Sequence, residues 1–520
     1  MLVTPLGKSV LPQTPTSIPS NAIRLPTELL KEIIDGLAAS MSQCPDLMRS
    51  TMKKVALTST QILPLARPHL FHTLELGGKH DPEGIRRTSL ARLLVEQPYL
   101  GNAVDHIIYV LHKEEKHLEI TSGVAPLLRL PKVSTLSITW VHRSLHESDD
   151  KPQPPDVTLG WRSLLRHYTA SNSLKSLFMQ HVSLLRGSIM PDILSSPTLT
   201  SVTFRDCFFY LDGSSQEWLT FTKSHSFNVI QEIEWTSKKR HAESLLVFLA
   251  SCPKLRKFTG EYLKRGGMRK FPSALSRPFL NLHRLELAFP CSSCDWETVS
   301  RDLSGICDGE ALFPVLKELV LGIDHIRQTI NPLFKNTPAL EYLKARGTPS
   351  PYFNFLECLQ PVGHHLKTID LVWIFPDAAL NEDATTSEPT LDCALSYLED
   401  FHLASIEHIS LTIGISNTWR YDTFQDLEIY EALGRVMDSY QGIIGTSAFP
   451  SLKTLEIAAV QNIGAKYWDG DGFEYIETAK AAWNEHLKAF VTDQSISYFY
   501  HARVYPMPYL TSNWDSPLEL

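Results

Sequence analysis

The sequence has little cysteine, no long apolar run and no basic excess, and each absence removes a class of protein. Eight cysteines are scattered over 520 residues, which argues against a disulfide-dense secreted scaffold and leads us to expect a cytoplasmic or nuclear location. No run of apolar residues reaches the roughly 18 that a membrane-spanning helix needs. The net charge of -8 is spread along the chain, whereas a nucleic-acid surface needs concentrated basic residues. We therefore expect neither a membrane nor a nucleic acid as partner.

Motifs for catalysis and cofactor binding are missing as well. The sequence holds no glycine-rich phosphate loop, nucleophile elbow or HExxH pair, so we expect neither enzymatic activity nor a cofactor. Cys291 and Cys294 have the spacing of half a zinc site, with His283 before them and Cys307 after them. Because no second such pair accompanies them, free cysteines in a loop are the preferred interpretation. A metal-dependent or redox enzyme is the less favoured alternative.

The N-terminal part of the chain predicts three short helices behind a leader. Residues 1–20 are rich in Pro, Ser and Thr and are expected to be disordered. Apolar residues recur at helical spacing over residues 25–37, where Gly36 is expected to end the helix. The same spacing over 47–56 predicts a second helix, and residues 62–71 predict a third that runs into an extended piece.

The stretch Leu25-Pro26-Thr27-Glu28, with paired aliphatic residues after it, resembles the start of an F-box. The stretch from Arg67 to Phe71 is similar to the Arg-x-x-Leu-Phe segment of fungal-type F-box proteins, whereas the family's Cys-Arg-x-Trp-like segment has no counterpart at residues 57–61. The resemblance implies a module that docks on a Skp-type adaptor and thereby joins a cullin-RING ubiquitin ligase. The residues alone leave open an amphipathic helix that caps the domain behind it. The expected adaptor contacts lie in the apolar stripes of the helices: Leu25, Pro26, Leu29, Ile33, Ile34, Leu37, Val55 and Leu57.

The rest of the chain repeats one hexapeptide pattern, apolar-x-x-apolar-x-apolar. The twelve occurrences lie 24 to 46 residues apart and start at Val104, Val133, Leu174, Leu199, Ile230, Leu255, Leu282, Leu316, Leu340, Leu366, Ile406 and Leu452. Two residues before the first apolar position a proline often stands, where it would end a helix and lead the chain into a strand. Helix-like segments between the hexapeptides cover residues 85–96, 161–168, 242–251, 296–306, 391–401 and 427–437.

This alternation of strand and helix resembles a divergent leucine-rich-repeat array, which implies a solenoid. The expected fold class is therefore α/β: a small N-terminal helical F-box, then an irregular leucine-rich-repeat solenoid with parallel strands on the concave face and helices outside. The alternative is an α/β protein whose parallel strands share a leucine-rich pattern by chance. The expected domains are a leader (1–20), an F-box-like module (21–76), the repeat array (77–460) and a C-terminal cap (461–520) that contains a helix near 478–491.

Strand alternation places the residues between the apolar ones on the concave face. They mix both charges with a few aromatic side chains, as surfaces that recognise proteins do. The expected substrate contacts are Phe178, Arg205, Glu234, Arg284, Tyr342 and Arg346. Together with the F-box resemblance, this predicts the substrate-recognition subunit of an SCF-type ubiquitin ligase, which docks an adaptor through its N-terminal helices and captures an unknown protein on the array. The alternative is a leucine-rich-repeat scaffold without ligase association.

Overall fold

The structure of the chain is a computed structural model. It describes residues 25–41, 45–76, 85–112, 127–141, 159–182, 185–186, 189–207, 209–210, 220, 223–225, 228–236, 248–249, 251–261, 279–288, 311–322, 331–347, 359–376, 403–417, 450–464 and 496–505. No helix within these residues is long and apolar enough to cross a membrane.

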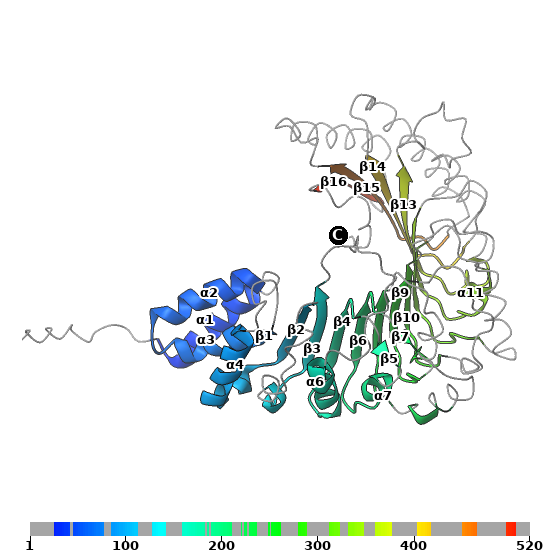
Figure 1. Ribbon diagram of the computed structural model, residues 1–520. Helices are drawn as coiled ribbons and strands as arrows, with labels where there is room; N and C mark the ends of the chain where they lie inside the picture. Colours follow the sequence, from blue (N-terminus) through cyan, green and yellow to red (C-terminus); the bar gives the residue numbers. More distant parts are fainter. Residues whose placement is uncertain are drawn as a thin grey trace, which may run out of the picture.

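A module of three helices is followed by one curved sheet. The helices are α1 (Thr27–Ser40), α2 (Pro45–Thr58), α3 (Leu63–Phe71), α4 (Ile85–Glu96), η1 (Pro98–Ala103), η3 (Leu127–Arg129), α6 (Leu159–Ala170), α7 (Ile189–Leu194) and α11 (Asn331–Lys335). The strands are β1 (Thr73–Leu76), β2 (His106–His112), β3 (Thr135–Val141), β4 (Ser176–Gln180), β5 (Leu185–Arg186), β6 (Ser201–Arg205), β7 (Phe209–Tyr210), β8 (Glu232–Thr236), β9 (Lys257–Glu261), β10 (Arg284–Ala288), β11 (Glu318–Gly322), β12 (Tyr342–Gly347), β13 (Thr368–Pro376), β14 (His408–Asn417), β15 (Thr454–Gly464) and β16 (Ile496–Tyr505). Figure 1 shows α1, α2 and α3 at one end of an arc whose inner side is lined by the strands, with α6, α7 and α11 outside.

The sheet has the topology of a solenoid. Its fourteen strands lie in the order β1-β2-β3-β4-β6-β8-β9-β10-β11-β12-β13-β14-β15-β16, and β5 pairs separately with β7. Every neighbouring pair is parallel. Apart from β5 and β7, each strand lies beside the one that follows it along the chain, so the apolar side of each unit is covered by its neighbours. The predicted α/β class with parallel strands on the concave face is confirmed.

The hexapeptide pattern located the strands accurately. Each of its twelve occurrences contains a strand that begins at its third residue, from β2 at His106 to β15 at Thr454. The pattern did not indicate β16, which pairs with β15 along ten residues. The sheet thus continues past residue 460, where the repeat array was expected to end, while most of the expected cap, including the segment 478–491, lies outside the described residues.

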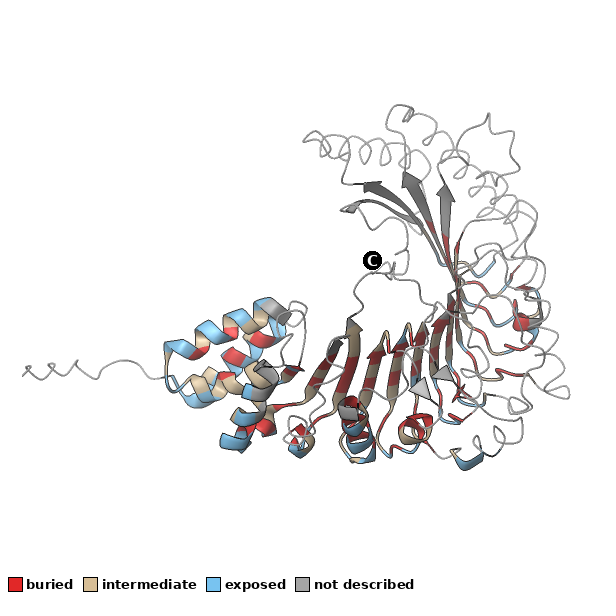
Figure 2. Ribbon diagram, viewed as in Figure 1, coloured by how far each residue is buried: buried red, intermediate tan, exposed pale blue. Residues whose placement is uncertain are grey.

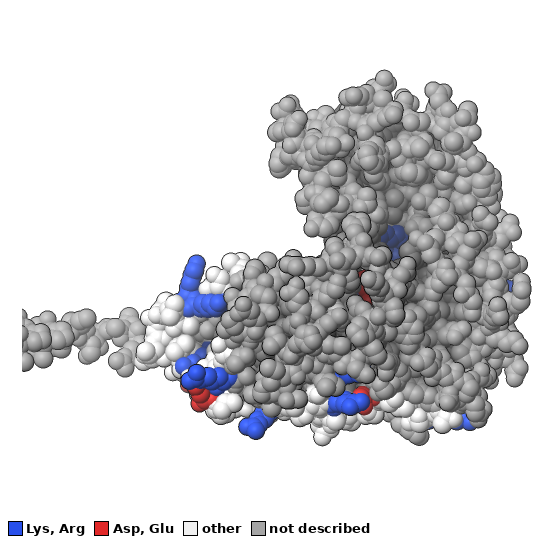
Figure 3. Space-filling model, in the orientation of Figure 1, with Lys and Arg blue, Asp and Glu red and all other residues white. Residues whose placement is uncertain are grey.

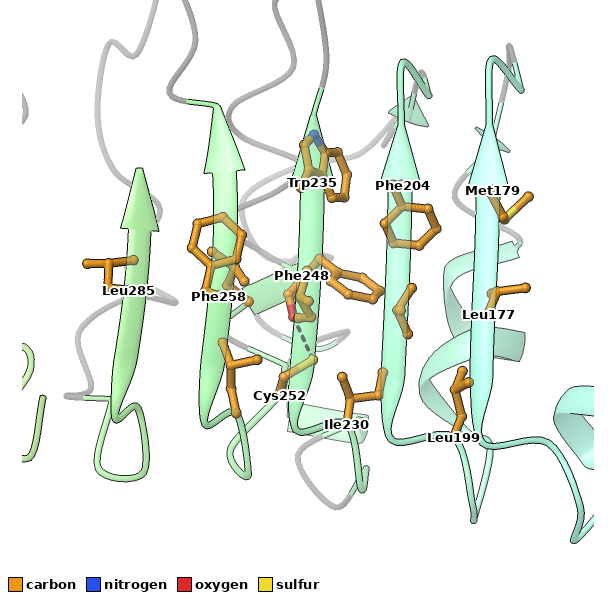
Figure 4. Close-up of a cluster of buried hydrophobic side chains, with 14 of the residues drawn as sticks. Leu177, Met179, Leu199, Phe204, Ile230, Trp235, Phe248, Cys252, Phe258 and Leu285 are labelled. Carbon is orange, nitrogen blue, oxygen red and sulfur yellow. Dashed lines mark hydrogen bonds between the residues drawn. The ribbon is translucent and has the colours of Figure 1, made fainter. Parts of the chain in front are cut away.

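Alternation of side chains builds the core on the outer side of the sheet. Along β4 and β6 buried residues alternate with half-buried or exposed ones, and Figure 2 shows the same banding across the strands. The centre of this core is aromatic: the ring centroid of Phe204 lies 5.2 Å from that of Trp235 and 5.6 Å from that of Phe248 (Figure 4). All three side chains are fully buried, so their apolar area stabilises the array.

A continuous row of backbone hydrogen bonds joins the units at the N-terminal ends of the strands. We call this side of the sheet the leading edge. In each unit the carbonyl oxygen of the residue just before the strand accepts from two successive N–H groups of the next unit. The carbonyl of Glu341, for example, accepts from Lys367 at 2.8 Å and Thr368 at 3.1 Å. Such pairs follow one another from the carbonyl of His72 to that of Glu407. The row satisfies buried backbone groups and fixes the register of the strands.

The N-terminal module has a small core of its own. Ile34 of α1 and Met52 of α2 are buried in one cluster. The prediction that α1 ends at Gly36 is wrong, because the helix continues to Ser40. Glycine disfavours helix by about 1 kcal/mol, but Ala38, one turn after Ile34, is buried in the same cluster, and this packing carries the helix past Gly36. The second and third predicted helices are confirmed as α2 and α3.

Two predicted outer helices are described in full. The segment 85–96 is α4, and 161–168 lies within α6. Of the segment 242–251 only residues 248–249 and 251 are described. The segments 296–306, 391–401 and 427–437 lie outside the described residues, as does the expected leader.

Candidate protein-binding surfaces

An exposed apolar stripe runs along α1. The exposed fractions of Leu25, Leu29 and Ile33 are 48 %, 46 % and 58 %, and Pro26 beside them is exposed as well. Leu29 and Ile33 are four positions apart and therefore stack along one side of the helix, and Leu25 and Pro26 come directly before its first residue. We call these four residues the α1 stripe. Ile34 lies on the buried side of the helix, so the stripe is an apolar surface additional to the one that packs inside the module.

The other predicted adaptor contacts divide between surface and core. Leu57, near the end of α2, is 86 % exposed. Ile34 is only 3 % exposed and packs with Met52, and Leu37 and Val55 are partly buried against the same cluster. Ile34, Leu37 and Val55 therefore hold the module together and offer little surface to a partner. The predicted contacts that remain at the surface are Leu25, Pro26, Leu29, Ile33 and Leu57.

The module is tied directly to the sheet. A single residue separates the end of α3 from β1, and Phe71 packs against the core of the array. Arg67 donates a hydrogen bond to the hydroxyl of Tyr99 at 3.2 Å, and its guanidinium lies 5.6 Å from the centre of the same ring. Figure 3 shows basic side chains on this helical end, with uncharged surface and one acidic patch beside them. The α1 stripe is thus carried on a support that is continuous with the array.

On the concave face, Phe178, Arg205 and Glu234 form one contact group across β4, β6 and β8. The Nε of Arg205 donates to Oε1 of Glu234 at 2.8 Å, and its guanidinium lies 5.4 Å from the centre of the Phe178 ring. Nearly half of the Arg205 side chain remains exposed. A pre-positioned arginine on an aromatic ring is the type of anchor that carries much of the binding energy in protein interfaces.

A second group lies on β10 to β13. Arg284 contacts Glu318 through Nη1 at 3.2 Å. On the next two strands, Oδ2 of Asp370 in β13 accepts from the hydroxyl of Tyr342 in β12 at 3.2 Å and lies 2.7 Å from Nζ of Lys344. Burial and the neighbouring Asp370 carboxylate raise the pKa of Tyr342, so its phenol stays protonated and donates to Asp370. Charged groups in this part of the face therefore largely pair with one another.

The structure brings the six predicted substrate contacts together only in part. Phe178, Arg205 and Glu234 touch, whereas Arg284 and Tyr342 belong to the second group on later strands. Arg346 is half-buried on β12, two residues beyond Lys344 and thus on the same face of that strand.

Sequence reasoning missed a ladder of opposite charges at the leading edge. Five successive units carry Lys317, Glu341, Lys367, Glu407 and Lys453 just before their strands, a set that we call the Lys–Glu ladder. Glu341 lies 2.9 Å from Lys317 and 3.0 Å from Lys367, and Glu407 lies 2.5 Å from Lys453. Hydrogen bonds from Lys317 and Lys367 lower the pKa of Glu341 to about 2. The signal was present in the sequence, because the second hexapeptide position alternates between Lys and Glu in these units.

No cluster of three metal-ligating side chains occurs among the residues that the structure describes. Cys291, Cys294 and Cys307 lie outside them. The described cysteines, Cys207 and Cys252, are buried thiols. Neither a scan of the chain against models of known protein families nor a search among curated proteins finds a match.

Proposed function

We propose that the chain is the substrate-recognition subunit of an SCF-type ubiquitin ligase. The α1 stripe and Leu57 would contact a Skp-type adaptor, and the concave face would hold the protein to be modified. The chain itself would perform no chemistry. Its contribution would be to keep the substrate near the ubiquitin-conjugating enzyme at high effective concentration.

The observation that carries this proposal is the exposed α1 stripe. A helix that only capped the array would direct its apolar residues inward, whereas α1 presents Leu29 and Ile33 to solvent in addition to its buried side, and Leu25 just before the helix is exposed as well. Burying each of these half-exposed side chains in a partner would contribute on the order of 1 kcal/mol. The resemblance of this stretch to an F-box is the reason for proposing a Skp-type adaptor as the partner. The concave face is a second, separate surface on which a protein could be held.

The test is copurification of the full chain with a co-expressed Skp-type adaptor. Charged groups introduced by Leu29→Asp with Ile33→Asp would be desolvated in the interface, so we expect binding to weaken by about 100-fold or more. Lys31→Glu is the matched control, because it alters the net charge by the same amount at an exposed position off the stripe. Thermal unfolding of both variants checks that the module remains folded.

Two results would count against the ligase proposal. The first is that the unaltered chain recovers no adaptor. The second is that the control and the double variant lose the adaptor equally. Retention of a protein bound to the concave face under either result would favour the alternative, a repeat scaffold without ligase association.

A further inference from the structure

Three cations that have no counterion among the described residues lie within four consecutive positions where β9 begins. Lys254 and Arg256 are exposed, and Lys257, the first residue of β9, is half-buried. Within the part of the chain that the structure describes, none of the three side chains makes an ion pair or a hydrogen bond. Positive charges on one short segment repel one another, and an anion that binds them relieves the repulsion.

The backbone that carries these cations is fixed. The N–H groups of Arg256 and Lys257 donate to the carbonyl of Gln231 at 2.7 and 2.9 Å, and the carbonyl of Arg256 accepts from His283 at 2.9 Å. Leu255 between them is 2 % exposed and anchors the segment in the core. A ligand would therefore have to order only the side chains, which reduces the entropic cost of binding.

The described residues of the neighbouring units do not neutralise the cluster. The equivalent residue before β8 is Gln231, and the one before β10 is His283. Glu232 is the register partner of Lys257, yet among the described contacts these two do not form an ion pair. On the other side the register partner of Lys257 is Arg284, a second cation, and Glu318, one strand further, is already engaged by Arg284.

The same edge behaves differently further along the chain. In the Lys–Glu ladder each described lysine lies within 3.0 Å of a glutamate oxygen. As far as the described residues go, the leading edge thus has a self-neutralised stretch at β11 to β15 and an uncompensated basic stretch at β9. The difference points to a partner that supplies the missing negative charge at β9.

We propose that Lys254, Arg256 and Lys257 dock a carboxylate-rich segment of a protein partner. Lys257 lies at the start of the concave strand and the other two lie just before it, so the segment would cross the leading edge onto the concave face. The identification of this partner as the captured protein rests on the proposed function, whereas the docking site itself does not. Its physical basis is charge complementarity at a fixed local site.

The test uses the purified full chain and a short fluorescein-labelled peptide rich in glutamate, with binding followed by anisotropy at low salt. The variant Lys254→Gln, Arg256→Gln, Lys257→Gln is expected to bind the peptide about tenfold more weakly, since three exposed ionic contacts are lost. The matched control, Lys317→Gln, Lys367→Gln, Lys453→Gln, removes the same charge from the ladder and is expected to bind like the unaltered chain. Added salt should abolish the difference between the two variants.

Three outcomes would overturn the proposal: no binding of the peptide to the unaltered chain, equal weakening in both triple variants, or equally tight binding of a single-stranded oligonucleotide of the same charge. The last outcome would indicate a nucleic-acid site instead.

Copurification of the variant Lys254→Gln, Arg256→Gln, Lys257→Gln with the adaptor separates this proposal from the proposed function. If the variant binds the peptide more weakly but still binds the adaptor, the result supports the peptide site independently of adaptor docking. Loss of the adaptor through Leu29→Asp with Ile33→Asp should likewise leave peptide binding unchanged.

Discussion

Two phenylalanines on neighbouring strands show how side-chain orientation decides the role of a residue. Phe204 of β6 faces the core against Trp235 and Phe248, whereas Phe178 of β4 faces the concave surface under Arg205. We expect Phe204→Ala to lower the free energy of unfolding by about 3–5 kcal/mol, because it leaves a cavity. Phe178→Ala should cost about 1 kcal/mol or less, the worth of a partly exposed cation–π contact. Denaturant unfolding of the two variants makes the comparison, and equal losses would contradict the assigned orientation.

The buried thiols offer a second test at single residues. Burial raises the pKa of Cys207 to about 12 and also raises that of Cys252. Since the thiolate is the reactive form, both should resist iodoacetamide at neutral pH and react only when denaturant opens the core. Mass-spectrometric mapping of alkylated peptides, with and without denaturant, measures this. Rapid labelling of either residue in the native chain would show that its unit opens locally.

At the level of elements, the period of the apolar residues predicted most of the fold. Residues such as Leu174 and Leu177 must be buried for a strand to join the sheet, and this requirement is visible in the sequence. The end of α1 could not be predicted from the sequence, because the packing of Ala38 outweighs the low helix propensity of Gly36. The sequence likewise predicted apolar residues along α1 but not which of them face inward, because Ile33 and Ile34 look alike until the position of α2 is known.

The Lys–Glu ladder predicts a pH dependence of stability. The pKa of Glu341 is about 2 in the folded chain against an ordinary value of 4.5, so its contribution to stability is present above pH 4.5 and is lost as the pH falls towards 2. Glu341→Gln should therefore be less stable than the unaltered chain at neutral pH, and the difference should shrink on acidification or at high salt. Glu32→Gln, at an exposed position of α1, is the control. Thermal unfolding at several pH values measures both, and a pH-independent difference would contradict the ionic origin.

At the level of the whole molecule, the two proposed binding surfaces belong to different hydrophobic clusters. The described buried residues include one cluster within α1 and α2 and another that runs through the array from Leu74 to Ile409. The α1 stripe depends on the first cluster, and the concave face depends on the second. Since solenoid units are stabilised mainly by their neighbours, damage to one cluster should remain local, although Phe71 and Arg67 connect the two parts.

Two buried methionines test this separation. Met52 and Met179 are both 0 % exposed, the first in the module and the second in β4, and truncation of a buried Met to Ala costs about 2–5 kcal/mol. We expect Met52→Ala to reduce amide hydrogen-exchange protection in α1 and α2 and to leave β8 to β12 unchanged. Met179→Ala should reduce protection in β3, β4 and β6 and leave the module unchanged. Adaptor binding should then suffer only from Met52→Ala, because the stripe needs a folded module and not an intact sheet. Uniform loss of protection in both variants would show instead that module and array unfold as one cooperative unit.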